Sequence, residues 1–182
     1  MTTCRTWWLS IATMMLCCLA QANASDRWTP EQAWTWYNRQ PWLCGFNYVP
    51  STASNTTEFW GEDTFDETTI ARELGWAHEK GFNSCRVFIQ YLVWKADPEG
   101  FKHRLDRFLE IADANDITVV PTLFDDCTFG DPPLREPFLG PQREPIPGMI
   151  LPSWTPSPGL ATVTDRSTWP DLERYVKDLT AT

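Results

Sequence analysis

Three short apolar segments alternate with helical patterns along this chain, and that order restricts the folds it can adopt. The segments span residues 42–49, 84–90 and 117–124 and are rich in β-branched and aromatic residues. Apolar strands that alternate with amphipathic helices are typical of parallel strands covered by helices. We therefore expect an α/β fold with parallel strands. The spacing of the strands fits both a (β/α) barrel and a doubly wound sheet.

The residues that follow the strands help to choose between these folds. No G-x-G-x-x-G sequence follows any of the three segments, which disfavours the dinucleotide-binding form of the doubly wound sheet. A closed barrel of eight units needs about 250 residues, whereas this chain has 182. If the fold is a barrel, the chain therefore comprises only the first three β/α units of a partial (β/α)8 TIM barrel.

Four helices have recognisable first residues. Thr29, followed by Pro30 and Gln32, predicts a capping box. Asp66, Asp97 before Pro98, and the sequence Trp169-Pro170-Asp171 begin the other three, and Gly81 ends the second. Their buried faces are predicted to comprise Ile70, Leu74 and Ala77, then Phe101, Leu105, Phe108, Leu109 and Ala112, and finally Leu172, Tyr175, Val176 and Leu179. Residues 51–64 are predicted to form a loop. The proline-rich residues 127–166 are interpreted as a long loop that lines a site rather than as a linker.

Residues 1–24 have the pattern of a signal peptide. Arg5 precedes the apolar run 7–20, and Ala22-Asn23-Ala24 is a small-x-small cleavage site. The apolar run is too short for a membrane-spanning helix, which needs about 20 residues. We expect cleavage near Ala24, a secreted or periplasmic product without membrane attachment, and a second segment, 25–182, that forms the N-terminal part of the barrel.

Composition and cysteine content exclude several classes of partner. The formal net charge of −9 repels phosphate backbones, so nucleic acid is not expected as a partner. Cys44, Cys85 and Cys127 follow the leader, and an odd number cannot all pair within the chain. We predict that each is a small buried side chain. His78 and His103 lie on predicted helices without ligand spacing, so neither a metal site nor a cofactor is expected.

The ends of the predicted strands carry the candidate site, because barrel enzymes place their chemistry at the C-terminal ends of the strands. Arg86 interrupts an apolar strand, where a charge needs a partner. The partner is either a catalytic carboxylate or the acidic residue of a structural salt bridge. The position of Arg86 alone does not decide between these two. Asp125 and Asp126 are adjacent on a strand, so they should point to opposite sides, one binding substrate hydroxyls and the other capping a turn. The remaining candidate substrate contacts are Asn47, Trp60, Gln90 and Trp94, the tryptophans as platforms for sugar rings.

Four segments together resemble the clan A glycoside hydrolases of the family 5 type, secreted bacterial proteins that act as 1,4-β-xylanases or cellulases. They are Gln40–Thr52, Glu73–Ala77 with Gly81–Phe88, Asp97–Phe101, and Leu123–Cys127. The resemblance runs from about Trp28 to the C-terminus. It implies that Arg86 supports the catalytic nucleophile, while Gln90 stands where many relatives have histidine.

The same resemblance implies that the full-length parent hydrolyses O-glycosidic bonds in β-linked polysaccharide such as xylan or cellulose. That chemistry needs an acid/base Glu after Asn at strand four and a nucleophile Glu at strand seven, about 5–5.5 Å apart. The chain has no Asn-Glu pair, so we expect it to be inactive alone. The alternative is a carbohydrate-binding or surface-adhesion module without turnover. An esterase is disfavoured, because no G-x-S-x-G sequence occurs.

Overall fold

The computed structural model describes residues 28–129, 133, 135–146 and 153–180. The predicted signal peptide lies outside the described residues. The chain divides into two compact units, Met1–Trp42 and Leu43–Thr182. Within the described residues, no helix has both the length and the apolar character needed to cross a membrane.

The first unit contains one described helix, α2 (Pro30–Tyr37). The predicted capping box is confirmed, because the Gln32 amide donates to the Thr29 hydroxyl and the Thr29 amide donates to the Gln32 side chain. The helix carries no buried residue. Among the described residues, Trp34 packs edge-to-face on Tyr37, and Trp36 packs edge-to-face on Trp28, which precedes the helix.

The second unit is built on a three-stranded parallel sheet of order β1-β2-β3, which confirms a mixed α/β fold. The strands are β1 (Gly45–Asn47), β2 (Ser84–Phe88) and β3 (Thr118–Thr122). Each is shorter than the apolar segment that predicted it, because only the residues that pair in register form the ladder. Gly45 is opposite Ser84, and Ser84 is opposite Thr118.

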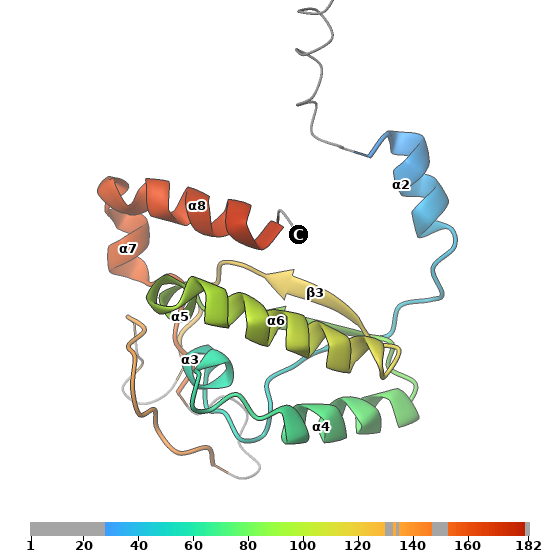
Figure 1. Ribbon diagram of the computed structural model, residues 1–182, viewed down its shortest axis with the longest axis horizontal. Helices are drawn as coiled ribbons and strands as arrows, with labels where there is room; N and C mark the ends of the chain where they lie inside the picture. Colours follow the sequence, from blue (N-terminus) through green and yellow to red (C-terminus); the bar gives the residue numbers. More distant parts are fainter. Residues whose placement is uncertain (1–27, 130–132, 134, 147–152, 181–182) are drawn as a thin grey trace, which may run out of the picture. The chain divides into compact units, whose positions relative to one another are not determined.

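Helices join these strands and flank the sheet. They are α3 (Thr56–Trp60), α4 (Glu67–Glu79), α5 (Tyr91–Ala96), α6 (Pro98–Asp113), α7 (Leu160–Thr164), the 3-10 helix η1 (Arg166–Thr168) and α8 (Trp169–Thr180). The predicted caps are confirmed, since the Asp66 and Asp97 carboxylates accept the amides of Thr69 and Gly100. Gly81, with φ of +87°, follows α4 in a conformation that favours glycine. Figure 1 shows α4 and α6 side by side.

Three short elements lie where loops were predicted. Helix α3 falls within 51–64, and Asn55 caps it by accepting the amide of Glu58. Helix α7 falls within the proline-rich segment 127–166, and η1 begins at the last residue of that segment, Arg166. All three are five residues or fewer, too short to produce a recognisable helical period. Helix α5, at Tyr91–Ala96, was also not predicted for that reason.

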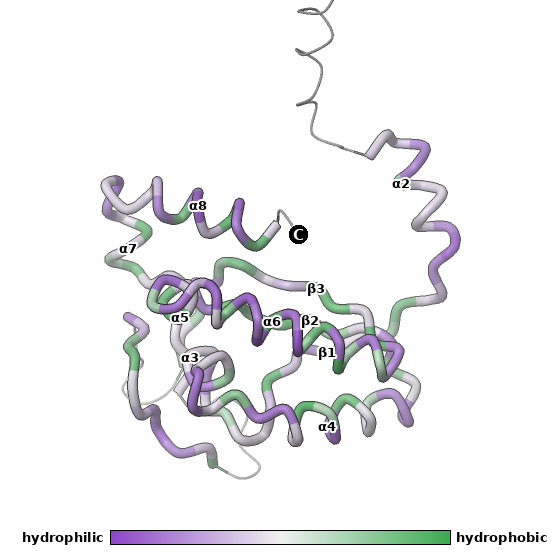
Figure 2. Tube along the Cα trace, viewed as in Figure 1, coloured by the Kyte–Doolittle hydropathy of each residue, from purple (hydrophilic) through white to green (hydrophobic). Residues whose placement is uncertain are grey.

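The two faces of the sheet have different surroundings. Phe46, Cys85, Val87 and Val119 point to one face and belong to, or pack against, the hydrophobic core formed with the helices. Asn47, Arg86 and Val120 point to the other face and are exposed. Figure 2 shows hydrophobic and hydrophilic residues alternating along α4, α6 and α8, as expected of helices with one buried side. Parallel sheets are ordinarily buried on both faces.

The core against the helices is rich in aromatic rings. Its largest fully buried side chains include Trp60, Trp94, Tyr91, Tyr175, Phe59, Phe101 and Phe108. The predicted helical faces are largely confirmed, with Ile70, Leu74, Phe101, Phe108, Ala112 and Tyr175 buried and Ala77, Leu105, Leu172, Val176 and Leu179 packed against them. The prediction for Leu109 is wrong, because this side chain is 40% exposed. It lies at the margin of the buried face of α6.

Candidate functional site

Arg86 and Asn47 are neighbours on the exposed face of the sheet. They are opposite each other in the β1–β2 register, and Arg86 Nε donates a hydrogen bond to Asn47 Oδ1 at 2.8 Å. The Arg86 guanidinium also lies 4.8 Å from the centre of the Phe88 ring. Among the residues that the structure describes, no carboxylate lies within ion-pair distance of Arg86. The guanidinium therefore keeps donors available on the exposed face.

Asp125 is held in place at the exit from β3. Its Oδ2 accepts a hydrogen bond from Trp154 Nε1 at 2.6 Å, and its Oδ1 accepts the Cys127 amide at 3.1 Å. Its backbone forms an antiparallel bridge with Ser157. Trp154 and Ser157 belong to the proline-rich segment and were not predicted as site residues. Nothing in the local sequence marks them, because they meet Asp125 only through the tertiary fold.

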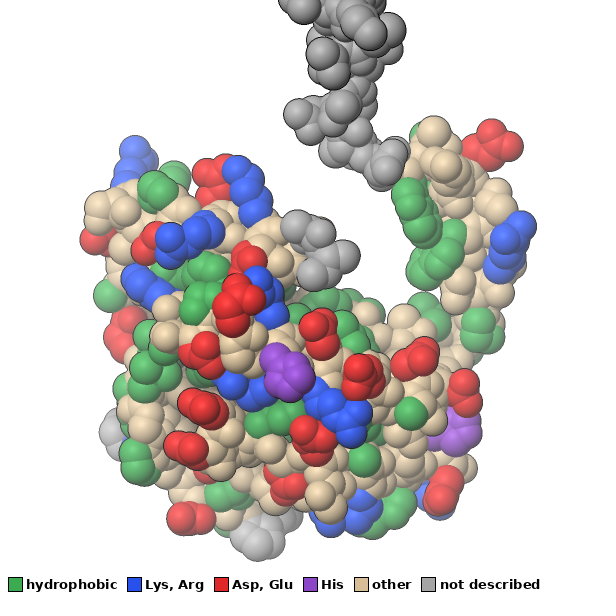
Figure 3. Space-filling model, in the orientation of Figure 1, with side chains coloured by type: hydrophobic (Ala, Val, Ile, Leu, Met, Phe, Trp, Pro, Cys, Tyr) green, Lys and Arg blue, Asp and Glu red, His purple; other side chains and the backbone are tan. Residues whose placement is uncertain are grey.

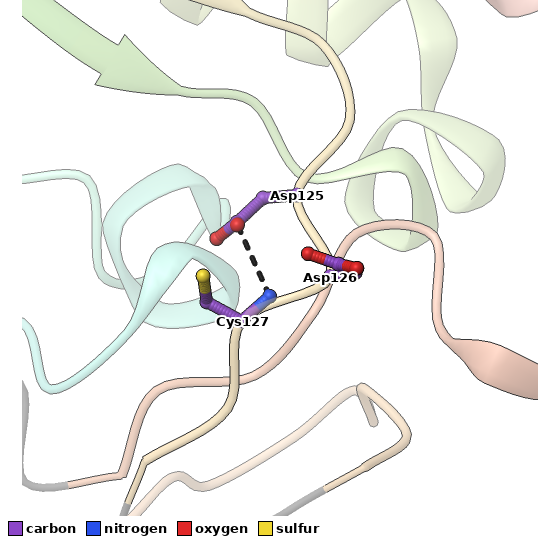
Figure 4. A group of neighbouring side chains, drawn as sticks. All are labelled: Asp125, Asp126 and Cys127. Carbon is purple, nitrogen blue, oxygen red and sulfur yellow. Dashed lines mark hydrogen bonds between the residues drawn. The ribbon is translucent and has the colours of Figure 1, made fainter.

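The predicted geometry of Asp125 and Asp126 needs correction. Instead of lying far apart on opposite sides of a strand, they have carboxylate oxygens within 4.8 Å of each other and of Cys127 Sγ. The reason is that β3 ends at Thr122 and the chain turns at Asp125, whose side chain accepts the Cys127 amide (Figure 4). The hydrogen bond and negative charge of Asp125 raise the pKa of the Cys127 thiol.

Carboxylate and thiolate groups are possible metal ligands, and this is the one such group of three among the residues that the structure describes. Asp125 already accepts two protein donors. Asp126 and Cys127 are exposed. We assign no metal to the group. His78 and His103 lie on α4 and α6, as predicted.

Gln90 does not face a substrate. It is fully buried, and its Nε2 donates to Thr56 Oγ1 at 3.0 Å and to the Pro156 carbonyl at 3.2 Å. Its Oε1 accepts the amide of Leu92 at the start of α5. The predicted substrate contact is therefore corrected to a structural one. Gln90 ties α3 and α5 to the segment that carries Trp154.

Trp60 and Trp94 do not form sugar platforms. Both rings are buried. Trp60 Nε1 donates to the Phe88 carbonyl, and Trp94 Nε1 donates to Asp178 Oδ2, each at 2.8 Å. The prediction for these residues is corrected, because each lies on a short helix, α3 or α5, whose apolar side packs into the core.

The three cysteines differ from one another in exposure. Cys85 is buried, as predicted, but Cys44 and Cys127 are exposed, so that prediction is wrong for both. Cys44 precedes the short strand β1 and Cys127 follows the turn after β3, where the sheet no longer covers them. Burial raises the pKa of the Cys85 thiol to about 12. All three are free thiols.

A cavity of about 820 Å³ adjoins Asp125 and Asp126. It lies within the second unit, between the exit from β3, helix α7 and the first half of α8. Its walls are largely apolar, and its polar lining residues include Arg135 and Glu173. A volume of this size is typical of small-molecule sites.

The second unit therefore carries an exposed polar pair, a fixed carboxylate and an apolar cavity. In comparisons with known proteins, no family model, no curated protein and no solved structure matches the chain.

Proposed function

We propose that this chain contributes three β/α units to a secreted (β/α)8 barrel protein of the glycoside hydrolase type, whose parent acts on β-linked polysaccharide such as xylan or cellulose. One observation carries the proposal. Among the residues that the structure describes in the second unit, the core lies on one face of the parallel sheet, and the other face presents Arg86, hydrogen bonded to Asn47. The proposed reaction, hydrolysis of O-glycosidic bonds, comes from the resemblance of the sequence to the clan A glycoside hydrolases.

A bare face on a parallel sheet is expected for the inner side of a barrel. Helices cover the outer side of such a sheet, and strand residues of the opposite parity fill the interior. In the proposed barrel, the side chains on the exposed face of the sheet are interior residues: Asn47, Arg86 and Val120. An interior arginine needs carboxylate partners, and it would hold a catalytic carboxylate in its ionised form.

The residues of this chain then have distinct roles. In the parent, Arg86 is a positioning residue for a nucleophile, and Asn47 orients its guanidinium. In the chain by itself, the remaining donors of the Arg86 guanidinium bind sugar hydroxyls. Asp125 and Asp126 accept hydrogen bonds from sugar hydroxyls at the end of β3. The sequence contains no Asn-Glu pair, so these residues bind polysaccharide without turning it over. Trp60, Gln90 and Trp94 have no part in binding, since they are buried.

Affinity electrophoresis tests this proposal. We expect the purified chain to migrate more slowly in native gels that contain xylan or hydroxyethylcellulose than in plain gels, and Arg86→Ala to reduce that retardation. Arg107→Ala is the control, because Arg107 lies on α6 and pairs with Glu67 and Glu110. Unchanged migration in both gels would overturn the proposal. So would an equal loss in the Arg107 variant, which would indicate a nonspecific charge effect.

A carbohydrate-binding or adhesion module without turnover is the second candidate. The observation that favours it is the set of exposed aromatic side chains in the first unit: Trp28, Trp34, Trp36, Tyr37 and Trp42. Exposed tryptophan rings can stack on sugar faces. This candidate predicts that Trp34→Ala or Trp36→Ala abolishes retardation and that Arg86→Ala leaves it unchanged. The barrel proposal predicts the reverse.

A further inference from the structure

The cavity beside Asp125 has walls suited to an apolar group. Helices α7 and α8 and the exit from β3 contribute the side chains of Phe124, Leu160, Val163, Trp169, Leu172 and Val176. Four of these are exposed large hydrophobic residues, with Trp169 51% and Phe124 44% exposed. The Trp169 ring is held by a hydrogen bond from its Nε1 to the Val163 carbonyl at 3.1 Å. The apolar wall is therefore both open and fixed.

The chain pairs its own backbone groups next to the cavity. The Asp125 amide donates to the Ser157 carbonyl at 2.9 Å, and the Ser157 amide donates to the Asp125 carbonyl at 2.7 Å. The preceding Leu123 carbonyl accepts the Tyr175 hydroxyl. Ser157 is also joined to the start of α5, because its Oγ accepts the amide of Tyr91. The cavity wall at the exit from β3 is therefore fixed.

Polar groups also line the cavity. Asp125 and Asp126 do so at the exit from β3. A sugar needs many hydrogen-bonding partners and fits the carboxylates, whereas an alkyl or aryl group fits the apolar wall. A ligand that joins both chemistries is a glycoside with an apolar aglycone.

We propose that this cavity binds the alkyl or aryl aglycone of a β-glycoside while the sugar lies at Asp125 and Asp126. The sugar part of this assignment rests on the proposed glycoside function, and the apolar part rests on the cavity alone. The proposed ligands thereby include, besides polysaccharide, β-glycosides that carry an apolar group.

Isothermal titration calorimetry on the chain tests this with three probes below their micellar concentrations: octyl β-D-glucopyranoside, methyl β-D-glucopyranoside and 1-octanol. We expect the octyl glycoside to bind at least tenfold more tightly than the methyl glycoside, because the alkyl chain leaves water. Val163→Trp, which fills the cavity, should remove the difference. Leu109→Trp is the control, because it adds the same ring at an exposed position of α6 outside the cavity.

The outcomes separate the two parts of the assignment. Equal binding of methyl and octyl glycosides would overturn the aglycone site and leave the proposed function standing. Equal binding of 1-octanol and octyl glycoside would leave the apolar site standing and overturn its assignment to a glycoside. If Val163→Trp fails to fold by circular dichroism, Trp169→Ala replaces it, and unchanged octyl glycoside binding in that variant overturns the site.

Discussion

Arg86 Nε and Asn47 Oδ1 are joined by a 2.8 Å hydrogen bond across two parallel strands, on the face of the sheet opposite the hydrophobic core. An arginine in the middle of an apolar strand thus ends on an exposed surface instead of in the core. Its charge remains solvated, which explains why the strand tolerates it. The pair is available for a further partner.

Replacing Arg86 should therefore have little effect on stability. We expect Arg86→Ala to change the free energy of unfolding by about 0.5 kcal/mol or less, as for other exposed positions. Arg104→Ala is the contrasting variant, because Arg104 is buried and donates from Nε to the Trp60 carbonyl. It should cost about 2 kcal/mol. Urea denaturation measures both, and equal losses would contradict the exposed position of Arg86.

Trp60 should behave as a core residue. Trp60→Ala is expected to reduce the free energy of unfolding by about 3–5 kcal/mol, because it removes a fully buried ring stacked on Phe59. Trp76→Ala on α4 is the matched control, since that ring is 55% exposed. Its loss should be about 0.5 kcal/mol. A Trp60 variant as stable as the control would restore this residue as a candidate sugar platform.

Gln90 should stabilise the segment that carries Trp154 and Pro156. Gln90→Leu removes the donor to Thr56 and to the Pro156 carbonyl, both buried hydrogen bonds, and should cost about 1–3 kcal/mol. Hydrogen exchange provides the specific readout, because the amides of Asp125 and Ser157 should exchange faster once the segment loosens. Unchanged protection at these two amides would show that Gln90 does not hold the segment.

The thiols should react at different rates with a disulfide reagent at pH 8, in a chain that begins at Ser25. Cys85 should react only on unfolding, since its pKa is raised to about 12 and the thiol is buried. Cys127 is exposed, but its raised pKa lowers the thiolate fraction, so its reaction is slowed. Asp125→Asn removes the charge and hydrogen bond responsible, and should accelerate Cys127. Rapid labelling of native Cys85 would contradict the structure.

Asp178 should contribute to the loss of stability in acid. The hydrogen bond from Trp94 Nε1 and the contacts of Lys102 lower the pKa of this carboxyl in the folded state. Its stabilising contribution is therefore complete above the unfolded pKa of about 3.9 and is lost as pH falls through the lower folded value. Asp178→Asn should flatten the acid limb of a denaturation profile. Asp106→Asn on the exposed side of α6 is the control.

Local signals in the sequence were sufficient for much of the fold. The caps at Thr29, Asp66 and Asp97 and the stop at Gly81 depend on neighbouring residues only, so the corresponding helices begin where they were predicted and α4 ends just before Gly81. The parallel order of the strands was also predictable. Two parallel neighbours in a sheet need a long crossover connection, which is usually a helix. Helices of six residues or fewer, such as α3 and α5, are too short to show the hydrophobic periodicity by which a helix is predicted.

The candidate site depended on tertiary structure far more. Three predicted contacts, Trp60, Trp94 and Gln90, follow strands in the sequence and were therefore expected to be accessible. In the structure, α3 and α5, which carry the two tryptophans, pack into the core, and Gln90 caps α5. Trp154 reaches Asp125 across 29 positions of the chain, a contact that no local pattern encodes.

The sequence by itself determined which residues start helices and which segments become parallel strands. Only the tertiary structure decided which face of the sheet the helices cover, and hence that Arg86 and Asn47 are exposed while Trp60 is buried. The physical reason is that capping and periodicity are short-range effects of neighbouring residues. Burial depends on which distant segments come together to exclude water.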